Sequence, residues 1–282
     1  MNWTHDNTAM ARSRAYITRG INREILELNR HYPCLLITGA RQVGKSTLLK
    51  QIMPKGMRYV SLDTESLSEF AQRDPTGFLD SYGTPLCIDE VQYAPRLFRT
   101  IKARVDAQQK NGMYWLTGSQ RYLMMHNVSE SLAGRIGIVD MHTLSQNETN
   151  GDGKAGPLTL NNLPKSVCKE SLCDISTLYK RIIRGGYPKL FREPGLTPAT
   201  FFRNYVNTYV KRDVRELTNV QNDVAFTKFM KAVALRTGQQ LVYADIAKTI
   251  EVDPKTVASW ISILQASGIV ELVQPYYVNI TK

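Results

Sequence analysis

The 282-residue chain has few of the features that mark membrane, secreted or metal-binding proteins. It has no apolar run approaching the ~20 residues of a membrane-spanning helix, and its first fifteen residues are polar and mixed in charge, unlike a signal peptide. Of its four cysteines, Cys34 and Cys87 lie in apolar segments, which argues against a disulfide framework. Cys168 and Cys173 have no neighbouring His or Cys pair to complete a zinc site. These absences predict a cytoplasmic chain with reduced thiols and no membrane partner.

The chain also lacks any dense run of lysine and arginine, although basic residues are in excess. The formal net charge is +11, and the isoelectric point is about 9.5. Residues 176–282 carry 15 Lys and Arg against 8 Asp and Glu, whereas residues 1–175 carry 21 against 17. A basic C-terminal third suits a polyanionic partner such as nucleic acid, although the same excess would also serve solubility alone.

The most informative segment fits G-x-x-x-x-G-K-[ST], the pattern of a phosphate-binding loop. The apolar residues 34–38 before it predict a buried strand, and residues 46–52 after it predict a helix that ends before Pro54. Glycines in such a loop allow successive N–H groups to point at one phosphate, and the helix N-terminus adds a partial positive charge. The residues predicted to contact nucleotide are Gly39, Ala40, Arg41, Gln42, Val43, Gly44, Lys45, Ser46 and Thr47.

A second apolar strand, residues 85–88, ends in the carboxylates of Asp89 and Glu90. Together with the loop this pattern predicts ATP and Mg²⁺ as ligands. Lys45 would reach the β- and γ-phosphates, the Ser46 hydroxyl would ligate Mg²⁺, and Asp89 would hold the ion through water. Glu90 would polarise the attacking water as a catalytic base, and a glutamate at this position marks the additional-strand class of ATPases.

A third strand, residues 113–117, also ends in polar side chains. Thr117 or Ser119 would lie beside the γ-phosphate as a sensor, although Ser and Thr are common turn residues at strand ends. The alternation of strands and helices predicts an α/β P-loop fold, a parallel sheet with helices on both faces and nucleotide at the carboxyl ends of the strands. Its other predicted elements are strands at 57–62 and 135–139 and helices at 18–30, 66–80, 95–109 and 129–133.

The alternating pattern ends near residue 145, which predicts three segments: a P-loop domain at 1–145, a linker or surface loop at 146–175, and a helical domain at 176–282. Helices are predicted at 178–183, 198–216 and 226–236. The aromatic residues of 198–216 recur near helical spacing, which favours helix packing over a platform for stacked bases.

Residues 241–278 predict a winged helix-turn-helix. Residues 243–250 and a helix that Asp253 caps form the helix pair, and residues 269–273 and 276–278 form the wing. The second helix would present Lys255, Thr256 and Ser259 to double-stranded DNA. These residues include one lysine and no arginine, which is few basic side chains for recognising bases. The alternative to DNA binding is a winged-helix module that contacts protein.

Several of these motifs together resemble the prokaryotic AAA-type ATPases that pair an N-terminal ATPase domain with a C-terminal region of unknown function. The matching segments are TGARQVGKSTL (38–48), IDEVQ (88–92), LTGS (116–119), SESLAGR (129–135), GGYP (185–188) and YVNTYVKRDV (205–214). The resemblance implies ATP binding and hydrolysis and a role for Arg135 near a γ-phosphate, in cis or in a neighbouring subunit. Members usually continue past the wing into a nuclease-like domain, whereas this chain ends at Lys282.

The leading hypothesis is therefore a Mg²⁺-dependent ATPase that couples nucleotide state to a DNA-associated winged-helix domain. The alternative is an ATP-dependent switch whose C-terminal domain binds protein and not nucleic acid. A homo-oligomer is compatible with either hypothesis, because Arg135 can act between subunits.

Overall fold

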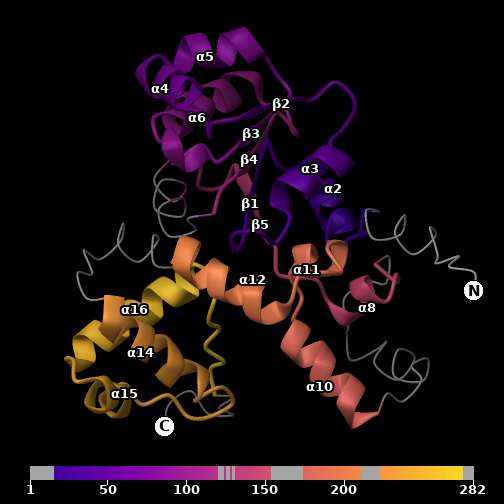
Figure 1. Cartoon of the computed structure of the whole chain (residues 1–282). Helices are drawn as coiled ribbons and strands as arrows, with labels where there is room; N and C mark the ends of the chain where they lie inside the picture. The colour runs from indigo at the N-terminus through magenta and orange to yellow at the C-terminus, as the bar shows by residue number, and fades with distance from the viewer. Residues whose placement is uncertain are drawn as a thin grey trace, which may run out of the picture. The chain divides into compact units, whose positions relative to one another are not determined.

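Five strands form a parallel sheet in the order β2-β3-β4-β1-β5 (Figure 1). In this computed structural model, which describes residues 16–119, 124, 128, 131–153, 174–210 and 223–275, β4 lies between β1, which leads into the phosphate loop, and β3, which ends in the acidic pair. An extra strand at this position defines the additional-strand class, so the predicted α/β P-loop fold is confirmed. The strands are β1 (Cys34–Thr38), β2 (Arg58–Ser61), β3 (Leu86–Asp89), β4 (Tyr114–Thr117) and β5 (Ile136–Asp140).

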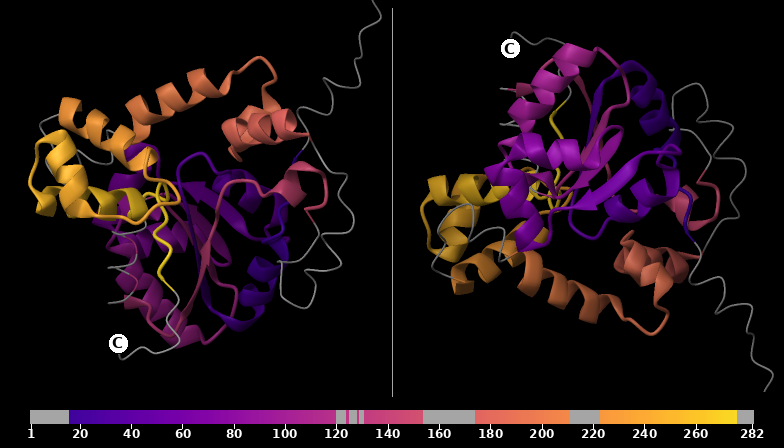
Figure 2. Two further views of the ribbon diagram at one scale, coloured as in Figure 1. Left: turned by 90° about the horizontal axis from the view of Figure 1, so that it is seen from below. Right: turned by 90° about the horizontal axis from the view of Figure 1, so that it is seen from above.

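Helices cover both faces of this sheet (Figures 1 and 2). Because successive side chains of a strand point to opposite faces, β1 contributes to two separate cores. Leu35 packs with residues of α2 (Asn22–His31) and α3 (Lys45–Ile52). Leu36 packs on the other face with residues of α4, α5 and α6. These helices are α4 (Glu65–Arg73), α5 (Pro75–Tyr82) and α6 (Leu97–Gln108).

Two predicted helices of this part differ from the observed ones. The prediction of one helix at 66–80 is wrong, because the chain breaks into α4 and α5 at Asp74. Pro75 has no N–H to continue α4, and the Asp74 carboxylate accepts a hydrogen bond from the Gly77 N–H at 2.9 Å, which begins α5. Helix α2 begins at Asn22 rather than at residue 18, and a 3₁₀ turn, η1 (Val91–Tyr93), precedes α6. Of the predicted helix at 129–133, residues 129 and 130 lie outside the described residues, residue 131 is helical and residues 132–133 form a turn.

The first residues of the predicted linker, up to residue 153, are described and begin with a short helix, whereas residues 154–173 lie outside the described part. Residues Gln146–Thr149 form α8, which the Ser145 hydroxyl and the Glu148 carboxylate cap reciprocally. The backbone N–H of Leu144 donates to the Gly186 carbonyl at 2.7 Å. The chain consequently divides into compact units at Met1–Arg203 and Asn204–Lys282, a different division from the predicted one. The first unit continues through α10 (Ile175–Arg184) and α11 (Pro188–Arg192) to α12 (Pro198–Tyr205), whose last residues lie beyond the division.

The second unit is helical. It contains a π-helical turn, η2 (Val206–Val210), and the helices α14 (Asp223–Ala234), α15 (Tyr243–Ile250) and α16 (Pro254–Ala266). The rings of Phe226, Phe229 and Trp260 pack together with centroids 5.1 to 5.6 Å apart, which joins α14 to α16. The helix predicted at 198–216 is described as far as η2, and its remainder falls among residues that the structure does not describe.

The helix pair of the predicted winged helix-turn-helix is present, but its first wing strand is not. The Asp253 carboxylate accepts from the Lys255 N–H at 2.6 Å and begins α16 as expected. The prediction of a strand at 269–273 is wrong, because this stretch has no strand pairing. The N–H groups of Ile269 and Val270 donate to the Leu264 carbonyl, so this backbone ends the helix instead. The second predicted wing strand, 276–278, lies outside the described residues.

Candidate active site

The loop between β1 and α3 requires glycine at two positions. Gly39 has φ 140° and Gly44 has φ 98°. A Cβ atom on Gly39 would lie 2.1 Å from the carbonyl oxygen of Met141, so a larger residue would collide with the segment that follows β5. Gly44 precedes the first residue of α3, which leaves the first N–H groups of the helix beside the loop. The local structure is that of an anion-binding loop.

Lys45 lies across this loop and is buried. Its Nζ atom donates to the carbonyl oxygens of Gly39 and Ala40, both at 2.9 Å. The ammonium group is therefore held where the loop backbone turns, beside the N-terminus of α3. The other predicted loop residues surround it: Ala40 and Val43 are buried, Arg41, Gln42, Gly44 and Ser46 are half-buried, and Thr47 is exposed.

Asp89 ends β3 at the carboxyl edge of the sheet and is 3% exposed. Its Oδ1 atom accepts from the Thr117 hydroxyl of β4 at 2.6 Å, and its Oδ2 atom accepts from the Tyr59 hydroxyl of β2. A buried carboxylate needs partners of this kind, and here they come from the strands on both sides. Thr117, one of the two predicted sensors, is therefore bonded to Asp89.

Tyr59 is a residue of the site that no sequence motif marked. Burial, and then the bond to the Asp89 carboxylate, raise the pKa of its phenol, so the hydroxyl remains a donor. Tyr59 therefore contacts Asp89, one of the two residues predicted to hold Mg²⁺.

Glu90 follows Asp89 in a left-handed backbone conformation, with φ 58°. Its Oε2 atom accepts a hydrogen bond from the side-chain amide of Gln92. Ser119, the other predicted sensor, lies just beyond β4 and is 4% exposed. Within the described part of the chain its hydroxyl has no hydrogen-bond partner, and a buried hydroxyl in that state is suited to a ligand.

Arg135 lies at the amino ends of the strands, on the side of the sheet away from the phosphate loop. Its carbonyl accepts from the Cys34 N–H, where β1 begins, whereas the phosphate loop follows the end of β1. Four residue steps along a strand correspond to about 13 Å. Its guanidinium pairs with Asp106 of α6, with Nη2 3.2 Å from Oδ2. This position does not fit the cis role, and a role in a neighbouring subunit remains a prediction.

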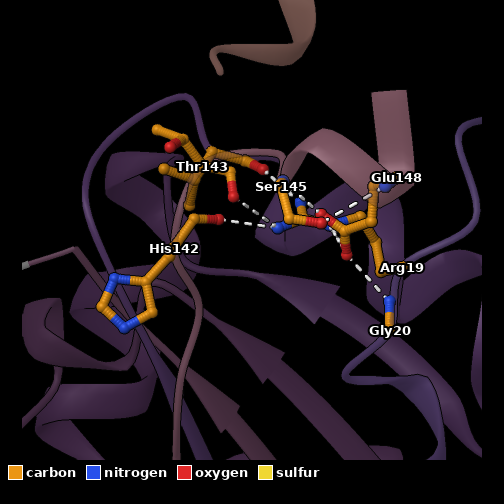
Figure 3. Close-up of polar contacts among 7 residues, drawn as sticks. Arg19, Gly20, His142, Thr143, Ser145 and Glu148 are labelled. Atoms are coloured by element: carbon orange, nitrogen blue, oxygen red, sulfur yellow. Dashed lines mark hydrogen bonds and ion pairs between the residues drawn. The ribbon is translucent and has the colours of Figure 1, made fainter. Parts of the chain in front are cut away.

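Arg19 is a second residue that sequence reasoning missed, and it connects the loop to the segment after β5 (Figure 3). Its Nη1 atom donates to the Val43 carbonyl at 3.0 Å, and its Nη2 atom donates to the His142 and Thr143 carbonyls at 2.7 and 3.3 Å. Its Nε atom pairs with Glu148 Oε1 at 3.0 Å, and the two side chains are 6% and 8% exposed. The guanidinium therefore meets a charged partner and three carbonyl acceptors in a buried position.

A pocket opens beside the phosphate loop, within the first unit. The loop and α3 contribute Val43, Gly44 and Thr47 to it, and Arg19 contributes from the N-terminal side. The pocket therefore adjoins the place where a phosphate chain would leave the loop. The rest of its lining is Tyr16, Ile17, Gln51, Leu144, Pro188 and Arg192.

The residues predicted to contact nucleic acid lie in the second unit, on the outer side of α16. Lys255 and Ser259 are exposed and Thr256 is half-buried. On the opposite side of the helix, the side chains of Val257 and Trp260 are buried. The helix therefore presents the predicted residues away from its own core.

The described residues offer no separate metal cluster of three or more His, Cys, Asp or Glu side chains. Cys34 and Cys87 are buried free thiols, and burial raises the pKa of Cys34 to about 12. Among the helices that the structure describes, each is too short or too polar to cross a bilayer.

The strand order and the phosphate loop define a P-loop ATPase fold. Residues 31–150 match the family described as an AAA domain, and residues 175–282 match a domain of unknown function, DUF8612. The N-terminal part of the chain is thus similar to AAA-type ATPase domains, and the C-terminal part matches a separate domain family.

Two relatives, Mb2031c of Mycobacterium bovis and Rv2008c of Mycobacterium tuberculosis, are each 25% identical to this chain over 252 residues. The match covers 89% of this chain and 52% of each relative, so the chain spans about half the length of these relatives. The Walker-type ATPase PABY2304 of Pyrococcus abyssi is similar in structure, with a TM-score of 0.55 and 15% identity over 87% of this chain and 88% of that one. That similarity supports the fold.

Proposed function

We propose that this chain binds ATP with Mg²⁺ and hydrolyses it, and that its nucleotide state acts on a C-terminal domain that contacts DNA. The observation that carries the ATPase part is that Lys45 follows β1 while Asp89 and Glu90 end β3, at the carboxyl ends of strands in one parallel sheet. At this place the Lys45 cation suits phosphate binding, and the buried Asp89 carboxylate suits metal binding. The Glu90 carboxylate suits the activation of water.

The residues present fit Mg²⁺ and a triphosphate. Ser46 and Asp89 offer the oxygen ligands that Mg²⁺ prefers, and the buried Ser119 hydroxyl offers a further polar group. Bound Mg²⁺ would neutralise charge on the phosphate oxygens. Lys45 would exchange its carbonyl acceptors for phosphate oxygens, and the Glu90 carboxylate would accept a proton from the attacking water.

The pocket beside the loop supports a nucleotide over a simple phosphate. A phosphate chain in the loop would direct the attached ribose and base toward Val43 and Thr47. The facing side chains of Tyr16, Leu144 and Pro188 are largely apolar, as the walls of base-binding pockets usually are. Nucleoside triphosphates should therefore bind more tightly than inorganic triphosphate.

Two substitutions test the ATPase. Lys45→Ala should abolish ATP binding or turnover, because it removes the cation that faces the transferred phosphate. Glu90→Gln should keep ATP binding and lower hydrolysis by about 10²–10⁴-fold, since an amide cannot act as the base. Glu27→Gln, an exposed carboxylate on α2, is the matched control and should hydrolyse ATP as the wild type does. Hydrolysis at the wild-type rate by Glu90→Gln would show that Glu90 has no such role.

DNA is the proposed partner because Lys255 and Ser259 lie on the exposed side of α16 and because the C-terminal third carries the larger basic excess. The alternative, a nucleotide switch that binds protein, is favoured by the same helix, which offers one lysine among the three predicted contacts. Gel shifts of the full chain over a range of salt concentrations, with and without ATP, separate the two. A salt-dependent shift supports DNA, and absence of a shift at low salt favours the protein-binding switch.

A further inference from the structure

Tyr59 contacts Asp89, one of the two predicted magnesium ligands. It belongs to β2, paired in parallel register with Cys87 of β3, so it stands on the same face of the sheet as Cys87 and Asp89. Lys50 of α3 covers this face of the ring, with its Nζ atom 4.3 Å from the ring centroid. Ser46 lies one helical turn before Lys50, so Tyr59 is held between α3 and β3.

We propose that the Tyr59 hydroxyl closes the magnesium site of the nucleotide-free protein, and that it has to release the Asp89 carboxylate before Mg²⁺ is held there. The inference rests on the proposed function, and it assigns to Tyr59 a part in setting the Mg²⁺ requirement. Tyr59 acts through the metal ligands and is therefore a positioning residue.

The hydroxyl competes with Mg²⁺ and its bound water for the electron pairs of the Asp89 carboxylate. Oδ1 of Asp89 is bonded to Thr117, and Oδ2 is bonded to Tyr59. Hydrogen bonds to a charged acceptor are stronger than neutral ones, so breaking this contact opposes metal binding by a measurable factor.

A purely structural role for Tyr59 predicts a different result. If the phenol only joined α3 to the sheet, its loss would lower stability and weaken nucleotide binding equally with and without Mg²⁺. If the phenol closes the site, its loss lowers the Mg²⁺ concentration that is needed and leaves metal-free binding nearly unchanged. The dependence on Mg²⁺ therefore separates the two roles.

The experiment measures binding of the fluorescent nucleotide mant-ATP to the full chain in EDTA and over a Mg²⁺ titration. Tyr59→Phe keeps the ring and removes the hydroxyl, and it should lower the half-saturating Mg²⁺ concentration about tenfold. Its affinity in EDTA should stay within about twofold of the wild type. Tyr82→Phe is the matched control, since this tyrosine packs on Phe78 of α5, and it should leave both values unchanged.

Melting curves with Mg²⁺ alone supply a readout without nucleotide. Mg²⁺ should stabilise Tyr59→Phe at concentrations that leave the wild type unaffected. If Tyr59→Phe does not fold, Lys50→Met tests the same point, because it removes the cation over the ring and should lower the Mg²⁺ midpoint by a smaller factor. An unchanged or raised Mg²⁺ midpoint in the folded variant overturns the inference alone. Failure of every protein to bind mant-ATP overturns the proposed function, and the inference with it.

Discussion

Replacing Arg19 should have a larger effect on stability than replacing any exposed arginine of the first unit. Arg19 is 6% exposed, and its guanidinium meets the Glu148 carboxylate and the carbonyls of Val43, His142 and Thr143. Arg19→Met keeps most of the apolar stem and removes all of these donors. The Glu148 carboxylate would then stay buried with the backbone N–H groups of residues 20 and 145 as partners.

The expected magnitude follows from this burial. Removing one partner of a buried ion pair costs about 3–5 kcal/mol, because the other charge remains in a poorly solvated position. In a domain of this size each kcal/mol corresponds to roughly 2–4 °C in melting temperature. The melting temperature of Arg19→Met should therefore fall by about 6–20 °C. The melting temperature of Glu148→Gln should fall by less, because this variant keeps the size of the side chain and its amide oxygen can still accept one hydrogen bond.

Thermal unfolding followed by circular dichroism measures this effect. The double variant Arg19→Met/Glu148→Gln should lose less stability than the sum of the two single variants, with a coupling of about 0.5–3 kcal/mol. Arg73→Met is the control, because Arg73 and Glu69 form an exposed pair worth less than about 0.5 kcal/mol. Additive losses in the double variant, or a loss in Arg19→Met no larger than in the control, would refute the reasoning.

Three further predictions concern other parts of the chain. Arg135→Ala should lower ATP hydrolysis on the order of 10²–10³-fold. Mixing it with Lys45→Ala should restore turnover if the site is shared between subunits, and a mixture that stays inactive would contradict a role in trans. Lys255→Glu in the full chain should weaken DNA binding equally across sequences and make the salt dependence shallower, and a change in sequence preference would contradict this. Because burial raises the pKa of Cys34 from 9.0 to about 12, the unfolded chain loses this proton first, so stability is retained below pH 9 and falls as the pH rises toward 12. Urea unfolding at several alkaline pH values measures this, and the stability of Cys34→Ala should depend less on pH than that of the wild type.

Features confined to a short stretch of chain could be predicted from the sequence. The phosphate loop needs glycines at fixed positions and a strand and a helix beside them, and all of these lie within about twenty residues. The same holds for Asp253 at the start of α16, where a cap and a proline act within one turn. Local chemistry decides these elements, and the structure has them where they were expected.

Elements that depend on two competing local signals were harder to predict. Residues 66–80 have helical periodicity throughout, but Asp74 and Pro75 together end one helix and begin another. Residues 269–273 are apolar enough for a strand, yet the N–H groups of Ile269 and Val270 bond to the carbonyl of Leu264 at the end of α16. In both places backbone hydrogen bonding at a helix end prevailed over the side-chain pattern.

Contacts between distant segments could not be predicted, because strand order and register are not written in any one stretch. Glu148 is 129 residues from Arg19, and its neighbours in sequence are polar and without periodicity, which suggested an exposed loop. Tyr59 sits in an apolar stretch that predicts a strand, without any sign of a neighbouring carboxylate. Only the parallel register of β2 with β3 brings Tyr59 to Asp89. The motifs could therefore single out Asp89 as a candidate magnesium ligand, whereas its contact with Tyr59 follows from the order and register of the strands.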